Sequence, residues 1–410
     1  MKRAMVLLLC VALLATPGCQ SPPQPGDSPQ SQPLALVGGT IYPSPTAAPI
    51  ADGVVLVEGP RISNLGTRDS VAIPADAEVI DCSGMFVVAG FQNSHVHFTE
   101  DKWQDVASQA AEQLSSKLEE MLLRYGFTTV VDTGSALDAT LALRSRIEAG
   151  QVTGPRILTA GTPIYPVDGI PYYLRESLPP QVLPFLHTPE TPQEAAQVVQ
   201  RQLSQDADLV KLFTGSWVER GRVLPMSTEI ARAAAEEAHR QGKLVFSHPS
   251  DQAGVEVALQ AGVDVLAHAP SDLRGWDESD SHRLQASAVA MVPTLKLFGG
   301  QSNIARIQQI VGDFADGGGQ VLFGTDVGYL TDYSPGDEYR LMSGAGLDWR
   351  DILASLTTAP AGRFRESSRR GRLAPQMDAD IVVLSSDPAV DPAALADVRY
   401  TVRGGRIVFK

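Results

Sequence analysis

The 410-residue chain is acidic and has an ordinary globular composition, with 43% hydrophobic residues, 20% charged residues and a formal net charge of −14. This charge argues against nucleic acid and anionic membrane surfaces as partners, because both repel an acidic protein. The length allows one large α/β barrel with a small accessory domain.

The N-terminal segment lies outside the expected fold. Lys2 and Arg3 precede an apolar run over residues 4–15, which has the length of a signal-peptide core and is too short for a permanent transmembrane helix. Gly18-Cys19 then resembles a bacterial lipobox. It predicts a lipoprotein signal peptide over residues 1–18 and a lipid anchor on Cys19, which would hold an exported protein on the periplasmic or surface side of a bacterial membrane. A soluble secreted form is the alternative, since Pro17 is unusual in such a motif.

Residues 19–33 are rich in Pro, Gln and Ser, a composition that cannot bury apolar area, and they predict a disordered tether. Export would permit disulfides, but Cys82 is the only cysteine after Cys19. Its apolar surroundings predict a small buried thiol with no redox role.

Short strands separated by turns are expected at both ends of the chain, over residues 34–88 and again over 368–410. Gly404-Gly405 predicts a two-residue hairpin, because both positions accept a positive φ. Neither end has enough strands to close a sheet alone. We therefore expect one small, discontinuous β-sandwich domain built from both ends, with residues 89–367 inserted between them.

The inserted segment alternates apolar strands with amphipathic helices. Eight strands are expected, over residues 91–98, 128–132, 156–161, 208–213, 243–248, 263–268, 290–295 and 321–326. Helices are expected over 106–124, over 228–241 with Ser227 as the N-cap, and over 303–316. Eight such units make an α/β fold that closes as a (β/α)8 TIM barrel. An open doubly wound sheet is the competing topology, but no Gly-rich phosphate motif follows the first strand.

Four of the seven histidines fall at the carboxyl ends of these strands, where barrel enzymes place their chemistry. His95 and His97 are two residues apart on one strand, so their imidazoles point to the same side. His248 and His268 end the fifth and sixth strands, and Asp326 ends the eighth, which neighbours the first in a closed barrel. This arrangement predicts a metal site.

Lys211 lies inside an apolar strand, where an unpaired ammonium is costly. A buried acidic partner would remove the cost. The alternative is a depressed pKa and reaction with CO2 to give a carbamate, an anion able to bridge two metal ions.

With these residues in place, the chain resembles the amidohydrolase superfamily, in its binuclear branch that includes prolidase-like dipeptidases and imidazolonepropionase-like proteins. Lys211 makes it more similar to the dipeptidases. The matching segments run in the family's order: Gly90-Phe91 before His95-Val96-His97, Gly126-Phe127-Thr128-Thr129-Val130, Gly154-Pro155-Arg156-Ile157-Leu158, Ala261-Gly262-Val263-Asp264 before His268, Gly324-Thr325-Asp326 and Ala379-Asp380-Ile381-Val382-Val383. Two departures are Asn93, where the family usually has an acid, and Pro249-Ser250-Asp251 after His248.

The resemblance implies two divalent metal ions, with Zn²⁺ first and Mn²⁺, Co²⁺ or Fe²⁺ as alternatives. His95, His97 and Asp326 would hold one ion, His248 and His268 the other, and a Lys211 carbamate would bridge them. A metal-bridging hydroxide would attack a carbonyl, and Asp326 would move the proton to the leaving nitrogen.

Substrate contacts are expected from the loops after the third and fourth strands. The candidate residues are Tyr165, Tyr172, Tyr173, Arg175, Trp217, Glu219 and Arg220. Either arginine could clamp a substrate carboxylate. Hydrolysis of an amide bond in a dipeptide or N-acyl amino acid is the leading hypothesis. The alternatives are a cyclic amide, imide or lactone hydrolase, and a non-catalytic ligand-binding lipoprotein. A homo-oligomer is a further possibility.

Overall fold

The computed structural model describes residues 32–410 except residue 179, and residues 32–410 form one compact unit. The expected signal peptide, the Cys19 anchor and most of the expected tether lie outside the described residues. Within the described part, none of the helices has both the length and the apolar character needed to span a bilayer.

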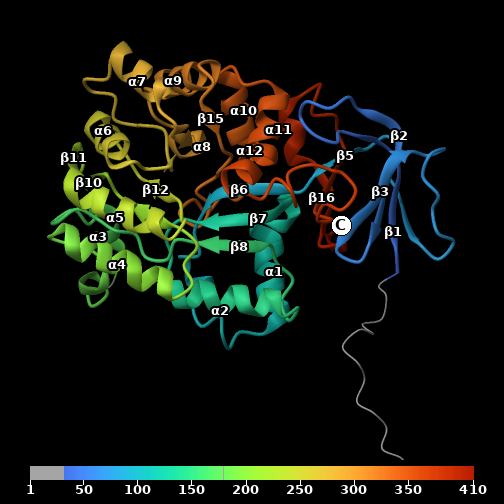
Figure 1. Cartoon of the computed structure of the whole chain (residues 1–410), viewed down its shortest axis with the longest axis horizontal. Helices are drawn as coiled ribbons and strands as arrows, with labels where there is room; N and C mark the ends of the chain where they lie inside the picture. Colours follow the sequence, from blue (N-terminus) through green and yellow to red (C-terminus); the bar gives the residue numbers. More distant parts are fainter. Residues whose placement is uncertain (1–31, 179) are drawn as a thin grey trace, which may run out of the picture. The chain divides into compact units, whose positions relative to one another are not determined.

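Strands from both ends of the described chain form one eight-stranded sheet (Figure 1). Its members are β1 (Leu34–Ile41), β2 (Ile50–Glu58), β3 (Arg61–Thr67), β4 (Glu78–Asp81), β5 (Phe86–Ala89), β16 (Ile381–Leu384), β17 (Val398–Arg403) and β18 (Arg406–Phe409). β5 pairs antiparallel with β16, and this ladder joins the N-terminal strands to the C-terminal ones. The expected composite domain is thus hydrogen-bonded as a single sheet.

The side chains of this sheet follow the period of two that strands impose. Leu34 and Leu36 of β1 belong to one apolar cluster, whereas Ala35 and Val37 belong to a second cluster on the other side. At the far end, β17 and β18 form the expected hairpin, and Gly404 and Gly405 take φ values of 53° and 77°. A side chain would be strained at both positions.

The segment between the chain ends forms a barrel of eight parallel strands. They are β6 (Phe91–Val96), β7 (Phe127–Asp132), β8 (Arg156–Thr159), β9 (Val210–Leu212), β12 (Val245–Ser247), β13 (Val265–Leu266), β14 (Ala290–Met291) and β15 (Gln320–Val321). Ladders join β6–β7–β8 and β9–β12–β13–β14–β15. Two hydrogen-bonded seams close the ring: Ile164 N donates to Lys211 O at 2.9 Å, and Ser94 N donates to Phe323 O at 2.7 Å.

The barrel interior is filled by side chains from successive strands. Val131, Leu158, Phe246, Val265 and Ala290 form part of one buried cluster, whereas their neighbours along the strands pack outward against the helices. Such a packed interior is characteristic of a TIM barrel. The expected open doubly wound alternative is therefore not the fold.

Helices surround the barrel (Figure 1). They are α1 (Ala111–Met121), α2 (Leu137–Glu148), α3 (Tyr172–Ser177), α4 (Pro192–Ser204), α5 (Thr228–Arg240), α6 (Gln252–Ala261), α7 (Glu278–Ala286), α8 (Leu295–Phe298), α9 (Ile304–Asp316), α10 (Gly336–Gly344), α11 (Trp349–Leu356) and α12 (Thr358–Arg363). Short 3-10 turns are η1 (Asp101–Trp103), η2 (Leu123–Tyr125), η3 (Leu183–Phe185) and η4 (Pro392–Ala396), and a hairpin of β10 (Gly215–Glu219) and β11 (Arg222–Pro225) follows β9.

The start of one expected helix was wrong. The helix expected from residue 106 begins at Ala111, because the Arg146 guanidinium binds the carbonyl oxygens of Val106 and Gln109 and holds that stretch as a turn. Ser227 is the N-cap residue of α5, as expected, but its hydroxyl donates to Glu229 at 2.7 Å and does not bond to the helix backbone.

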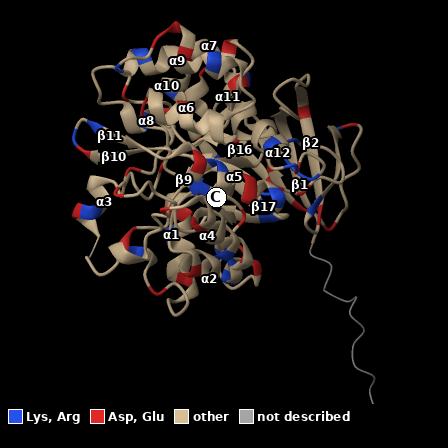
Figure 2. Cartoon of the chain, turned by 60° about the vertical axis from the view of Figure 1, so that its left-hand side comes forward, with Lys and Arg blue, Asp and Glu red and all other residues tan. Residues whose placement is uncertain are grey.

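A single residue, Gly90, separates β5 of the sheet from β6 of the barrel, and its N–H donates to Asp380 O at 2.8 Å. A Cβ at Gly90 would lie 2.4 Å from Thr128 Oγ1, so only glycine allows this approach. The amino ends of the barrel strands therefore adjoin the β-domain, and β7 and β8 point away from it (Figure 1). Lys and Arg are interspersed with Asp and Glu along the elements (Figure 2).

Candidate metal centre and active site

His95 and His97 lie at the carboxyl end of β6, and their imidazoles face the same point. The two Nε2 atoms are 3.2 Å apart, and Asp326 Oδ1 lies 3.2 Å from His95 Nε2 and 3.0 Å from His97 Nε2. One ligand atom from each of the three residues falls within 4.8 Å of the others. All three side chains are buried or nearly so.

The hydrogen bonds of the two imidazoles fix their tautomers. His95 Nδ1 donates to Ala267 O at 2.7 Å, and His97 Nδ1 donates to Gly134 O at 2.9 Å. Since a carbonyl oxygen only accepts, both protons are assigned to Nδ1, and both neutral Nε2 atoms carry lone pairs. These lone pairs face each other and the Asp326 carboxylate.

Asp326 occupies a left-handed backbone conformation with φ 57°, in the loop five residues after the end of β15. Its Oδ1 is buried and has no hydrogen-bond donor among the described residues. Burial removes this carboxylate from water, so its Oδ1 lacks both a donor from the described residues and solvent.

Close backbone packing at Gly324 and Gly328, on either side of Asp326 in the chain, positions its carboxylate. A Cβ at Gly324 would lie 2.3 Å from Val292 Cγ1, and a Cβ at Gly328 would lie 1.9 Å from His97 O. Asn93 donates from Nδ2 to Thr325 Oγ1 at 2.7 Å and accepts from His95 N at 3.1 Å. Asn93 thus links the first strand to the last and does not bond to either imidazole.

Lys211, in β9, is 2% exposed. Among residues 32–410 apart from 179, no carboxylate pairs with its ammonium, and its Nζ lies 5.7 Å from the centroid of the Phe213 ring. Burial lowers the pKa of Lys211 to about 7, with the Asp326 and Asp132 carboxylates opposing the change. The expected alternative of a lysine paired with a buried acid is thereby disfavoured.

His248 and His268 complete the group of residues that the sequence singled out. Their rings contact edge to face at 4.4 Å, and His268 lies 4.5 Å from the His95 ring. Phe213 stacks on His248 at 4.6 Å. Burial and the nearby Lys211 lower the pKa of His248 well below its ordinary value, which favours the neutral, ligating imidazole.

These residues fit a metal ion. An imidazole and a carboxylate that converge at 3.0–3.2 Å without a shared proton repel one another unless a cation lies between them. Neutral imidazole nitrogen and carboxylate oxygen are ligands that Zn²⁺ and related ions prefer. The donor set therefore suits a divalent cation.

The expected substrate residues lie around this group at different distances. Tyr165 is buried with its ring 4.7 Å from Phe213, so it forms a wall behind His248. Arg175 donates from Nη2 to Val218 O and is therefore engaged with the hairpin. The exposed Arg220 lies with its Cζ 5.2 Å from the ring centroid of Tyr172, and Trp217 is half-buried in β10. Glu219 pairs with Arg222 at 2.8 Å.

Sequence reasoning missed several residues that support the site. Asp132 accepts from the hydroxyls of Ser135, Thr140 and Thr159, and so shapes the turn that presents Gly134 O to His97. Tyr329, three residues after Asp326, contacts the ring of Tyr173. The position of Asp132 at the end of the second barrel strand was the one available signal.

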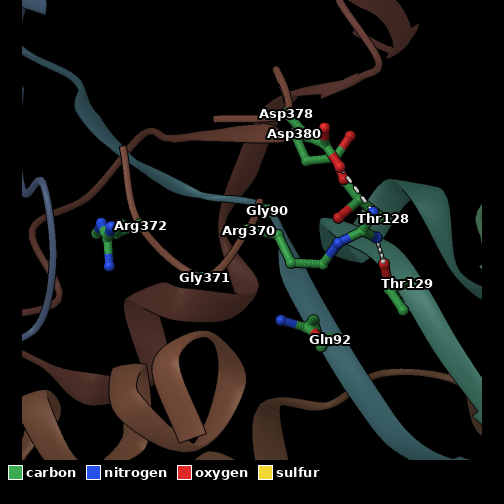
Figure 3. Close-up of a pocket in the computed structure, with 9 residues that line it drawn as sticks. All are labelled: Gly90, Gln92, Thr128, Thr129, Arg370, Gly371, Arg372, Asp378 and Asp380. Atoms are coloured by element: carbon green, nitrogen blue, oxygen red, sulfur yellow. Dashed lines mark hydrogen bonds and ion pairs between the residues drawn. The ribbon is translucent and has the colours of Figure 1, made fainter. Parts of the chain in front are cut away.

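A separate polar cluster lies at the opposite end of the barrel, beside Gly90 (Figure 3). Arg370 donates to Thr129 Oγ1 at 3.3 Å and to Asp378 Oδ2 at 2.7 Å. The side chains leave no room for a water-sized molecule. This cluster joins the barrel to the β-domain and is not the active site.

Comparison with known proteins agrees with this barrel fold, which carries a cluster of two histidines and an aspartate at its mouth. Residues 86–408 match the model of the amidohydrolase family, so the chain belongs to that family. The solved structure of a protein assigned as a prolidase from Bifidobacterium longum is 25% identical, with a TM-score of 0.75, over 93% of this chain and 96% of that one.

Curated relatives match over shorter segments. Ochratoxinase from Aspergillus niger is 21% identical over 235 residues, which are 52% of this chain and 49% of that protein. A 5-methylthioadenosine/S-adenosylhomocysteine deaminase from Symbiobacterium thermophilum is 43% identical over 65 residues, 16% of this chain and 15% of that enzyme. The chain thus spans half or less of the length of these curated relatives.

Proposed function

We propose that the protein is a metal-dependent hydrolase that cleaves the amide C–N bond of a dipeptide or an N-acyl amino acid. The observation that carries this proposal is the convergence of two imidazole lone pairs on the donor-free Oδ1 of buried Asp326. The names of two relatives, prolidase and ochratoxinase, support hydrolysis of an amide as the reaction.

The family resemblance suggests how the ligands divide between two ions, and the grouping of His95, His97 and Asp326 supports the first of them. His95, His97 and Asp326 would hold one ion, and His248 and His268 a second ion beside it. When bound, such ions lower the pKa of water from about 15.7 to roughly 7 and polarise a carbonyl. Asp326 Oδ2 makes no hydrogen bond to a described residue, so it is free to take a proton from the attacking water and pass it to the leaving nitrogen.

Lys211 would act as a bridging ligand once it has become a carbamate. The amine must be neutral to add to CO2, and its pKa of about 7 makes the neutral form abundant at neutral pH. The carbamate would bring a negative charge to this buried position, where the ammonium pairs with no carboxylate of the described residues.

Hydrolysis of a small-molecule panel tests this function directly. Protein beginning at Gln32, the first residue of the compact unit, would be loaded with Zn²⁺ and incubated with dipeptides and N-acyl amino acids. A second panel would contain cyclic amides, imides and lactones. Lys211→Ala serves as the metal-site control, because it removes the carbamate while leaving the imidazoles in place.

Cleavage of the linear panel that disappears in Lys211→Ala would support an amide hydrolase of this class. Cleavage of the ring panel alone would transfer the proposal to cyclic substrates. Failure on both panels, in protein shown to contain two metal ions, would contradict the proposed function and leave a ligand-binding protein as the remaining hypothesis.

We also propose that the protein is an exported lipoprotein anchored through Cys19. The support is the Gly18-Cys19 motif after a short apolar run. Labelling of bacteria that express the full chain with a radioactive fatty acid tests it. Label on wild type and none on Cys19→Ala is the expected result, and equal labelling would contradict the proposal.

A further inference from the structure

Asp132 is the last residue of β7, and its side chain is completely buried. Its Oδ1 accepts from Gly134 N at 3.1 Å and from Ser135 Oγ at 2.6 Å. Its Oδ2 accepts from Thr140 Oγ1 and from Thr159 Oγ1, both at 2.9 Å. Each carboxylate oxygen therefore binds two donors, and the side chain is held from two sides.

The four donors come from separate elements of the fold. Thr140 lies in α2 and Thr159 ends β8, whereas the other two donors belong to the turn between β7 and α2, which we call the β7 turn. Thr159 Oγ1 also accepts from Gly161 N at 3.0 Å, which leaves its hydroxyl proton for Asp132. Asp132 consequently fixes the β7 turn against both a helix and a neighbouring strand.

The β7 turn makes two hydrogen bonds to the segment that carries His97. Gly134 O accepts from His97 Nδ1 at 2.9 Å, and Ser135 Oγ accepts from Phe98 N at 2.8 Å. A Cβ at Gly134 would lie 3.4 Å from His97 Cε1, so the turn packs directly against the imidazole. Each path from Asp132 to this segment therefore passes through a single intermediate residue.

The direction of the His97 lone pair depends on this turn. Because Gly134 O only accepts, it holds the imidazole proton on Nδ1 and leaves Nε2 facing Asp326 Oδ1, which lies 3.0 Å away. His95 Nδ1 donates instead to Ala267 O, in the loop after β13. The two imidazoles of the candidate metal site are thus oriented by different elements, and the β7 turn orients only one of them.

Resting on the ligand roles of the proposed function, we propose that Asp132 is a positioning residue of the metal site. It fixes the β7 turn so that Gly134 O selects the Nδ1–H tautomer of His97 and directs Nε2 toward Asp326. Its carboxylate does not bond to either imidazole, so the effect is transmitted through the turn. Partners that orient a metal-binding histidine in this way typically change metal affinity by about 10- to 100-fold.

Two substitutions of Asp132 separate loss of the contacts from a change of charge. Asp132→Ala removes all four acceptor contacts and releases the turn. Asp132→Asn keeps one oxygen for Gly134 N and Ser135 Oγ, and its amide nitrogen can donate to the oxygens of Thr140 and Thr159 after their hydroxyls rotate. We therefore expect Asp132→Asn to retain the function that Asp132→Ala loses.

Asp264→Ala is the matched control. Asp264 also accepts from the backbone of a barrel strand, at Val245 N with a distance of 2.8 Å, and it contacts His239 Nε2 at 2.8 Å. It directly precedes β13 and Val245 begins β12, so both lie at the amino end of the barrel, opposite the imidazoles. Its removal tests what the loss of any such carboxylate does to the metal site.

NMR of metal-free protein with ¹⁵N-labelled histidine measures the tautomer directly. Spectra would be recorded at about pH 8.5, above the ordinary titration range of histidine, and His97→Gln would identify the His97 signals by their absence. We expect a single Nδ1–H tautomer for His97 in wild type and Asp132→Asn. Asp132→Ala should populate both tautomers of His97 and leave His95 unchanged. A single Nδ1–H tautomer of His97 in Asp132→Ala would overturn the proposal.

Zinc affinity provides a second readout. In titrations against a chromophoric chelator, Asp132→Ala should weaken one of the two zinc-binding steps by about 10- to 100-fold and leave the other unchanged. Asp132→Asn and Asp264→Ala should stay within about threefold of wild type in both steps. Equal weakening of both steps in Asp132→Ala, or a matching loss in Asp264→Ala, would indicate a general structural effect and overturn the positioning role.

Neither readout depends on turnover. Wild-type protein that shows the expected tautomer and zinc binding but cleaves neither substrate panel would count against the proposed hydrolysis alone. If Asp132→Ala does not fold, Ser135→Ala replaces it, because this variant breaks only the path through Phe98 N. Loss of that path should weaken the same zinc-binding step about fivefold. Unchanged zinc binding in Ser135→Ala would then overturn the proposal.

Discussion

His268 Nδ1 lies 2.7 Å from Thr294 Oγ1, and Thr294 holds this position in a left-handed conformation with φ 47°. The Thr294 hydroxyl donates to Pro293 O at 2.9 Å, so its oxygen accepts the Nδ1 proton and leaves His268 Nε2 free for a metal. A β-branched residue in this region is strained. The strained residue is therefore the one that orients His268, which would hold the second ion.

Removal of the Thr294 hydroxyl should weaken the binding of the second metal ion. We expect Thr294→Val, which keeps the shape and the β-branch, to lower the affinity for the second zinc ion by about 10- to 100-fold. Thr294→Ser keeps the acceptor and should retain most of the affinity. Titration against a chromophoric chelator measures both, and equal loss in the two variants would show that the hydroxyl is not the determinant.

Glu338 should make stability depend on pH. It accepts from Leu295 N at 2.9 Å and Lys296 N at 2.6 Å, and burial raises its pKa to about 7 although these N–H groups lower it. A carboxyl whose pKa is raised in the folded state makes the folded protein less stable as the pH rises from about 4.5 to about 7. Relative to Glu338→Gln, wild type should therefore lose up to about 3 kcal/mol of unfolding free energy over that interval.

Urea unfolding of metal-free wild type and Glu338→Gln, between about pH 4.5 and about pH 8, measures this difference. Groups common to both proteins cancel, including the site histidines. A difference that stays constant across the interval would contradict the raised pKa.

Lys211 should make metal loading depend on CO2. Loading in bicarbonate-free, degassed buffer should leave fewer than two zinc ions per chain, and Lys211→Ala should do the same in any buffer, because no bridging anion forms. Addition of propionate to Lys211→Ala should restore part of the second ion, since the acid places a free carboxylate in the vacated space. Elemental analysis gives the ratio, and two tightly held ions in Lys211→Ala would contradict the bridging role.

Arg370 should contribute to stability without affecting the metal site. It is 9% exposed and pairs with Asp378, which also contacts Arg61 and Arg369. Arg370→Met should lower the unfolding free energy by about 2–3 kcal/mol. This is less than the usual cost of breaking a buried ion pair, because Arg61 and Arg369 still contact the Asp378 carboxylate. The exposed Arg372→Met is the control, and its unfolding free energy should stay within about 0.5 kcal/mol of wild type.

Cys82 should report unfolding. It is buried, burial raises its pKa to about 11, and it is the sole cysteine of residues 32–410. An aromatic disulfide reagent should react with it only when the protein opens, because the reagent needs an accessible thiolate. Rapid reaction in native buffer, at a rate near that in denaturant, would contradict this burial.

The sequence predicted the site residues that recur in the barrel strands or at their carboxyl ends. His95 and Lys211 lie within strands and His97 and His248 directly follow them, where an apolar pattern and its interruption by a polar residue are visible. The barrel and the two-ended β-domain followed from counting strands in the same way. The boundaries at residues 88/89 and 367/368, and the ligand roles themselves, stay predictions.

The supporting residues could not be predicted because their partners are distant in sequence. Thr294 reaches His268 across 26 residues, and Glu338 reaches Leu295 across 43. No local sequence pattern predicts that a threonine takes a left-handed backbone conformation or that a glutamate is buried. The sequence also left open whether Arg175 or Arg220 could clamp a substrate carboxylate. The bond from Arg175 to Val218 O, which joins two loops, could not be predicted from the sequence.

The Gly90 junction also has a mechanical consequence. β1, the first described strand, shares a sheet with β5, and β5 passes into the end of β6 that lies farthest from His95 and His97. In the proposed lipoprotein, the anchored segment would therefore enter the fold through the β-domain, at the end of the barrel opposite the imidazoles.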